Sequence, residues 1–140
     1  MSAEIINSAG RSATLIDYDY AMVRVVPRVD TGMFFNVGIV LHARTADFLD
    51  AMLHVDHEQL ALLGCAVDTA LLQRCLDAYG LVCRGGKDGG PIGMLPPSER
   101  FHWLTAPRSA VIQTSPVHPG RCHDPQQALE YLFRQHCTIR

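Results

Sequence analysis

The sequence predicts an α+β domain with a mostly antiparallel sheet of about four to five strands and helices packed on one face. Three observations carry this prediction. Apolar and polar residues alternate with a period of two in the first half of the chain, which is typical of strands. These early strands follow one another as a hairpin that continues into a meander, which pairs them antiparallel. Later stretches place apolar residues at helical spacing behind residues that can cap a helix.

The first strand is expected within residues 18–28. Ala21, Val23 and Val25 point one way there, and the residues that alternate with them point the other way: Tyr20, Met22, Arg24, Val26 and Arg28. Pro27 lacks the N–H that a central strand needs, so it indicates that the strand is ending.

The second strand is expected in the β-rich stretch FFNVGIVLH, after a turn at VDTGM. Gly38 within it often marks the close approach of another backbone or of a ligand. A third strand over residues 48–55 would continue the meander. Alternation in the second strand predicts one face with Val37, Ile39 and Leu41, and an opposite face with Asn36, Gly38, Val40 and His42.

Two helices are expected next. Asp56 can cap the first one, and Gly64 can end it. Asp68 can cap the second, which carries an apolar stripe and is expected to end at Gly80. This second helix is expected to cover the sheet.

The glycines of RGGKDGGP then predict a mobile surface loop. From Arg100 onward the pattern predicts strands around His102 and Val111. A bend at Ala106 and Pro107 is expected to separate them.

The two ends of the chain differ. Residues 1–16 lack a clear period and are expected to form a loose lead-in, so that a single α+β domain covers residues 17–140. Asp124 at a cap position and Pro125 at the first helical position predict a final amphipathic helix.

Composition limits the class of protein. With 140 residues, 48% of them hydrophobic, one compact domain is the default. A net charge of -2 gives no general attraction to nucleic acid or to an anionic membrane. No run approaches the roughly 18 apolar residues of a membrane span, and the start has no apolar signal core, so a cytoplasmic location is expected. Five irregularly spaced cysteines favour reduced thiols over a disulfide framework.

Side chains capable of chemistry are concentrated in residues 100–118. Arginine forks bind carboxylate or phosphate groups through paired hydrogen bonds, and histidine exchanges protons near neutral pH. Together with a polar strand face, this segment predicts a ligand-binding or partner-binding surface. Its candidate residues are Arg24, Arg28, Asn36, Arg100, His102, Trp103, Arg108, Gln113, Thr114, Ser115 and His118.

The roles of these residues stay open at this point. The strand face with Arg24 and Arg28 can hold an anionic ligand or simply be solvated. On a strand, Arg100 and His102 would share a face, which makes His102 a catalytic candidate beside His118, with a structural histidine as the alternative. The polar residues that follow Pro107 can cradle a phosphate or satisfy the backbone of a turn.

Two further kinds of site have little support in the sequence. Ser115 lacks the G-x-S-x-G elbow of a serine nucleophile, and Pro116 follows it directly. His118, Cys122 and His123 lack a paired ligand motif. Neither a metal nor a cofactor is therefore expected.

Three stretches resemble a known family. They are YDYAMVRVVPR at residues 18–28, FFNVGIVL at residues 34–41 and ERFHWLTAPRSAVIQTSPVH at residues 99–118. They look like the bacterial family called domain of unknown function 3037 (DUF3037), and the resemblance spans nearly the whole chain. The family implies no established activity and no catalytic residue. Its members are often encoded beside proteins that resemble HipA-type kinases, so the resemblance implies a HipA-like kinase as a candidate partner.

Three function classes compete. The first is a non-catalytic partner or regulatory module that acts with a HipA-like kinase or another protein. The alternative is a small enzyme or ligand-binding protein for a phosphorylated or carboxylated compound, using residues 100–118. Nucleic-acid binding fits poorly, because the chain is net acidic and has no basic helix.

Overall fold

The computed structural model describes residues 14–27, 33–56, 58, 68–108 and 110–137. Two predicted segments lie mostly outside these ranges: the lead-in at residues 1–16 and the helix at residues 56–64. The elements in chain order are β1 (Ile16–Val25), β2 (Phe35–Ala43), the 3-10 turn η1 (Arg44–Ala46), β3 (Phe48–Leu53), α2 (Thr69–Arg84), the 3-10 turn η2 (Lys87–Gly89), α3 (Gly90–Gly93), α4 (Pro97–Leu104), β4 (Ile112–Thr114), β5 (His118–Cys122) and α5 (Pro125–Cys137).

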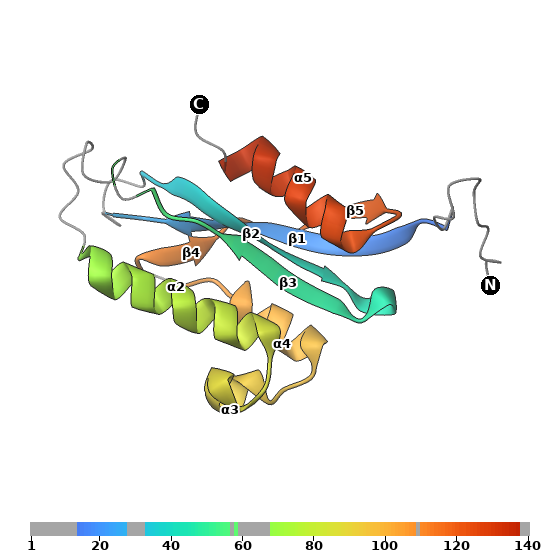
Figure 1. Ribbon diagram of the computed structural model, residues 1–140, viewed down its shortest axis with the longest axis horizontal. Coiled ribbons are helices and arrows are strands. Elements are labelled where there is room, and N and C mark those ends of the chain that lie inside the picture. Colours follow the sequence, from blue (N-terminus) through green and yellow to red (C-terminus); the bar gives the residue numbers. More distant parts are fainter. Residues whose placement is uncertain (1–13, 28–32, 57, 59–67, 109, 138–140) are drawn as a thin grey trace.

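One antiparallel sheet organises the fold (Figure 1). Strand β1 is central and pairs with β2 along one side, and β3 lies beyond β2 at the edge of the sheet. Strands β4 and β5 share the other side of β1, one after the other along its length. The α+β class and the antiparallel sheet predicted from the sequence are confirmed.

Helices cover both faces of this sheet (Figure 1). Helices α2 and α4 pack against the face that carries Ala21 and Val23. Helix α5 packs against the opposite face, where Leu129 meets Ile39 and Leu41. The prediction that the helices lie on one face is wrong in this respect. Because β2 is buried on both of its sides, each face of the sheet needs a cover.

A bulge changes which residues of β2 share a face. The pairing register shifts after Val23, and Val37 is the extra residue on β2. Val37 joins the core under α2 and α4, whereas Ile39 and Leu41 lie under α5. The prediction that these three residues share a face is wrong, because a period of two holds only where no residue is inserted.

The same bulge places Asn36 toward α5. Its side-chain amide donates a hydrogen bond to the backbone oxygen of His136 at 3.4 Å. The prediction that Asn36 shares a face of β2 with Gly38, Val40 and His42 is therefore wrong. Gly38 lies so close to the backbone oxygen of Met52 in β3 that a Cβ atom would not fit, which confirms the expected close approach of another backbone.

Helix α2 begins as predicted and ends later. The Asp68 carboxylate accepts two backbone N–H groups of its first turn at 3.1 Å each. The helix continues through Gly80 and ends at Gly85, where φ is +82°. The predicted end at Gly80 is wrong, because a glycine ends a helix when its backbone turns to positive φ, and Gly80 stays helical.

Helix α4 replaces the strand that was predicted around His102. Arg100, Phe101 and Leu104 are its buried residues, at the spacing of one face of a helix. Arg100 is thus turned inward while His102 is exposed, so the two side chains do not share a face as they would on a strand.

The glycine-rich segment forms two helical turns, η2 and α3, where a mobile loop was predicted. The backbone N–H of Gly86 donates to the oxygen of Gly93 at 2.8 Å, and that of Gly89 donates to the oxygen of Gly86 at 3.2 Å. These hydrogen bonds close the segment on itself.

The C-terminal region confirms one prediction and adds a strand. The Asp124 carboxylate accepts the backbone N–H of Gln126 at 3.0 Å, as expected for the cap of α5. Strand β5 contains a proline and Gly120, which are atypical of strands, and the ring of Tyr18 covers the glycine. Among the helices of the described residues, none is long and apolar enough to cross a membrane.

Candidate functional site

The structure divides the predicted site residues among three places. Arg24 and Asn36 face each other across β1 and β2. The residues between Arg100 and Ser115 lie around α4 and β4, and His118 begins β5. Arg28 lies outside the described residues.

Arg100 is buried, and its guanidinium group donates to backbone oxygens. Its Nε donates to Leu95 at 2.9 Å, and its Nη1 donates to Val82 at 3.1 Å and to Cys83 at 2.6 Å. Two of these oxygens belong to the last turn of α2, where carbonyl groups lack helical partners and carry the negative end of the helix dipole. Arg100 therefore joins α4 to the end of α2, and these donors are not directed at open solvent.

The polar residues at the end of β4 also make backbone contacts. The Ser115 hydroxyl accepts the N–H of Met22 and donates to the oxygen of Pro116, both at 2.9 Å. The side chains of Gln113 and Thr114 donate to backbone oxygens at 2.9 Å and 3.3 Å. These contacts match the second role considered for the segment, which is to satisfy the backbone of a turn.

Arg24 and Asn36 have unused hydrogen-bonding capacity. The guanidinium carbon of Arg24 lies 4.0 Å from the centre of the Phe34 ring, as in a cation–π contact. Nε of Arg24 and Oδ1 of Asn36 are buried and find no hydrogen-bond partner in the described part of the chain. Such atoms are uncommon in folded proteins.

An apolar groove of about 640 Å³ runs between α2 and the segment that joins α4 to β4. Three large apolar side chains along it stay partly open to solvent: Leu71 at 49%, Trp103 at 37% and Val111 at 39% exposed. Single exposed apolar residues are ordinary on protein surfaces, but several that line one groove indicate a binding surface. We call this surface the Trp103 groove.

Arg108 is the cationic residue of the Trp103 groove. Its guanidinium carbon lies 4.4 Å from the centre of the Trp103 ring, and its Nη2 donates to the backbone oxygen of Trp103. Asp68, the acidic residue of the groove, already accepts the N–H groups at the start of α2. Arg108 thus offers a positive charge that no described carboxylate neutralises.

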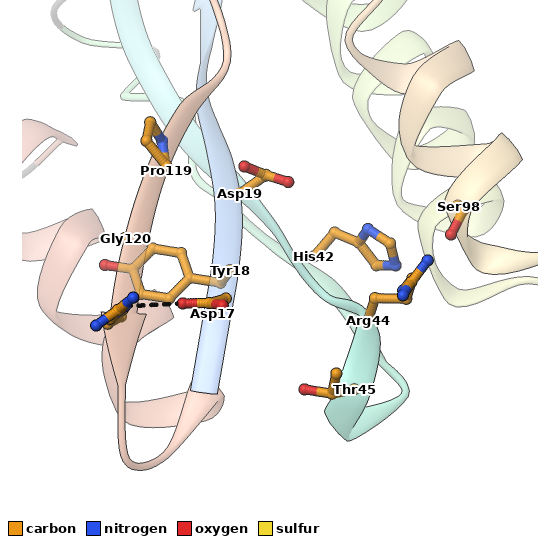
Figure 2. Close-up of a pocket in the computed structure, with 10 residues that line it drawn as sticks. Asp17, Tyr18, Asp19, His42, Arg44, Thr45, Ser98, Pro119 and Gly120 are labelled. Atoms are coloured by element: carbon orange, nitrogen blue, oxygen red, sulfur yellow. Dashed lines mark hydrogen bonds and ion pairs between the residues drawn. The ribbon is translucent and has the colours of Figure 1, made fainter. Parts of the chain in front are cut away.

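A second, polar hollow of about 810 Å³ lies at the other end of the same sheet face (Figure 2). None of the predicted site residues lines it. The sequence did hold a signal for it. Asp17 and Asp19 alternate in phase with the core residues Ala21 and Val23, which places two carboxylates on a face that is otherwise buried.

His42 forms the floor of the polar hollow. It is 8% exposed, and its ring centre lies 5.3 Å from that of Phe101 in α4. Burial lowers the pKa of His42, with Asp19 opposing the shift and Arg44 and Arg100 adding to it. Its imidazole is therefore neutral at neutral pH, a form that can both donate and accept a hydrogen bond.

The charged groups of the polar hollow lie on opposite sides (Figure 2). Asp17 and Asp19 project from β1, and Asp17 pairs with Arg121 of β5 at 3.0 Å. On the other side, Arg44 follows β2 and Ser98 lies in the first turn of α4. The hollow thus has an acidic side, where Asp19 lies beside the Asp17–Arg121 ion pair, and a basic side at Arg44.

Metal ligands are not gathered in the described residues: no three His, Cys, Asp or Glu side chains there are close enough to hold an ion. The described cysteines are free thiols, as the sequence predicted. They are Cys75, Cys83, Cys122 and Cys137.

The fold and these surfaces define a small α+β domain in which an antiparallel sheet lies between two helical layers, with the Trp103 groove and the polar hollow among its surface depressions. The model of one protein family, described as "Protein of unknown function (DUF3037)", matches residues 20–137. The chain belongs to this family, as the three sequence stretches indicated. No curated protein and no solved structure matches it.

Proposed function

We propose that this protein is a non-catalytic module that binds another protein through the Trp103 groove. The observation that carries the proposal is the set of apolar side chains left open along one groove, with the Arg108 cation stacked on Trp103 beside them. Tryptophan and arginine are enriched among the residues that dominate the binding energy of protein interfaces.

The groove fits an amphipathic segment of the partner. Apolar side chains of that segment would pack on Leu71 and Val111, where each square ångström removed from water contributes about 25 cal/mol. A carboxylate of the segment would pair with Arg108, because a charge-assisted hydrogen bond is stronger than a neutral one. A helix laid into an apolar groove is a common mode of protein recognition.

We propose a HipA-like kinase as the partner to test first. The choice follows from the family resemblance, which associates such kinases with relatives of this chain. A regulatory module of this kind would bind the kinase and change its activity.

The alternative of an anion site on residues 100–118 has less support. Arg100 and Ser115, which such a site would use, already make hydrogen bonds to backbone groups. We therefore keep the protein-binding function as the conclusion.

The test is co-expression with a HipA-like kinase, followed by size-exclusion chromatography with light scattering. The expected result is a complex whose mass is the sum of both chains. Leu71→Asp and Arg108→Ala should each weaken it by about tenfold or more, which corresponds to about 1.4 kcal/mol. Leu71 lies in the first turn of α2, where an acidic residue favours the helix, so the fold tolerates this change.

The matched control is Tyr131→Asp. Tyr131 is 55% exposed on α5, which covers the opposite face of the sheet, so this change should leave the complex intact. A chain that elutes alone and leaves kinase activity unchanged overturns the kinase as partner. Equal binding by Leu71→Asp and Tyr131→Asp overturns the Trp103 groove as the contact surface.

A further inference from the structure

We infer that the polar hollow beside His42 binds a small zwitterion, a compound with one ammonium and one carboxylate group, as in a free amino acid or a short peptide. This inference goes beyond the proposed function, because the hollow lies apart from the Trp103 groove and the ligand is a small molecule. The acidic side of the hollow, its basic side, its floor and its size each bear on the choice of ligand.

The acidic side suits an ammonium group. Asp19 is exposed and makes no hydrogen bond or ion pair among the described residues. Asp17 stands two residues away on the same face and shares its charge with Arg121 at 3.0 Å. An ammonium group donates up to three hydrogen bonds and has no acceptor, so free carboxylate oxygens are its natural partners.

The basic side suits a carboxylate group. Arg44 is exposed and has no ion-pair partner in the part of the chain that the structure describes. Ser98 stands in the first turn of α4, next to Pro96 and Pro97, and no side chain caps this helix. Because Pro97 has no N–H, Ser98 and Glu99 supply the first-turn N–H groups of α4 that lack an intrahelical partner, and their partial positive charge adds to the attraction of Arg44 for an anion.

His42 supplies a polar group at the floor of the hollow. It is 8% exposed and lines the hollow, and its imidazole makes no hydrogen bond among the described residues. Figure 2 shows the ring pointing into the space between the two charged sides. The imidazole nitrogens are not among the buried atoms that lack a partner, so they reach the hollow and offer a ligand one donor and one acceptor.

Size and charge together select the class of ligand. A volume of about 810 Å³ lies within the roughly 300–1,000 Å³ of small-molecule sites. Because Arg121 offsets the charge of Asp17, a ligand with only negative groups would be repelled mainly by Asp19, and one with only positive groups would be repelled by Arg44. A zwitterion satisfies both sides at once.

The experiment records NMR spectra of the full chain with isotope-labelled histidine while probes are added. A panel made up of the twenty amino acids and a set of dipeptides built on glycine is titrated first. Tighter binding by the amino acids or by the dipeptides then shows which of the two kinds of zwitterion the hollow prefers. Glycinamide and N-acetylglycine then serve as matched probes that keep only the ammonium or only the carboxylate. We expect saturable shifts of the His42 ring with a zwitterion, and about tenfold or more weaker binding by each single-charge probe.

Variants then test the assignment of the two sides. Asp19→Asn and Arg44→Gln each change an exposed side chain and should weaken zwitterion binding by about tenfold or more without altering the fold. Arg134→Gln, on the exposed side of α5, should leave it unchanged. The inference is overturned if no member of the panel shifts the His42 ring, if glycinamide or N-acetylglycine binds as tightly as a zwitterion, or if both hollow variants bind like the parent chain. None of these outcomes depends on whether the kinase complex forms.

Discussion

The guanidinium group of Arg100 occupies the space that a side chain at Gly85 would need. A Cβ atom on Gly85 would lie 2.9 Å from Cζ of Arg100, closer than such atoms approach in proteins. Gly85 also has φ +82° and ψ 168°, a backbone conformation that is essentially restricted to glycine. The end of α2 therefore requires glycine for two separate reasons, its backbone geometry and its contact with Arg100.

Gly85→Ala should lower the free energy of unfolding more than Gly86→Ala does. Gly86 has φ +100°, but a Cβ atom added to it would have no neighbour within 4 Å, so its substitution isolates the backbone strain, about 1–3 kcal/mol. The alanine at residue 85 adds a clash with Arg100 worth about 1 kcal/mol or more. Urea denaturation followed by circular dichroism measures both. Equal losses would show that the contact with Arg100 contributes nothing.

Arg100→Met should destabilise the fold by about 2–4 kcal/mol, because it leaves the buried oxygens of Val82 and Cys83 without their donor. Arg84→Met is the matched control. Arg84 is exposed in the last turn of α2, where its charge contributes about 0.3–1 kcal/mol through the helix dipole. Urea denaturation compares the two variants, and similar midpoints would contradict a structural role for Arg100.

The strands β1 to β3 and the helices α2 and α5 were predictable because their signals are local. Alternation marks a strand that has one apolar face, and Asp68 and Asp124 cap the helices that follow them. A strand was predicted where the short helix α4 forms, because its eight residues fit a period of two as well as a helical period. Only its contact with the end of α2 explains why Arg100 is buried there.

The candidate surfaces were predictable only in part, since each joins distant segments. Trp103 and Arg108 were identified from the sequence, but the apolar wall that faces them comes from Leu71 and its neighbours in α2. The polar hollow joins β1, β2, α4 and β5. No local pattern places His42 next to Phe101, because that contact depends on how α4 packs on the sheet.

Thiol labelling should distinguish Cys75 from Cys83. Cys75 is exposed, whereas Cys83 is buried and its burial raises the pKa of the thiol to about 12. The thiolate is the reactive form, so iodoacetamide at pH 8 should modify Cys75 about 100-fold faster than Cys83 in the folded chain. Peptide mass spectrometry measures both rates, and the difference should vanish in urea. Equal rates without urea would contradict the burial of Cys83.

His42 links the stability of the fold to pH. Its pKa in the folded chain lies below the ordinary value of 6.5, mainly because of burial. Below pH 6.5 the unfolded chain therefore binds more protons at this residue than the folded chain does, and stability falls as pH falls toward the folded pKa. The stability that the neutral form of His42 contributes to the fold is fully present above pH 6.5. The free energy of unfolding should thus drop more between pH 7 and pH 5 in the parent chain than in His42→Gln.

Two substitutions beside His42 should move its pKa in opposite directions. The charged groups that face it are Asp19 from β1, Arg44 and Asp47 from the segment after β2, and Arg100 from α4. Asp19→Asn removes a negative charge that favours the imidazolium, so it should lower the pKa further. Arg44→Gln removes a positive charge that disfavours the imidazolium, so it should raise the pKa. NMR titration of the His42 ring measures both shifts, and a shift of the same sign in the two variants would contradict this arrangement of charges around the polar hollow.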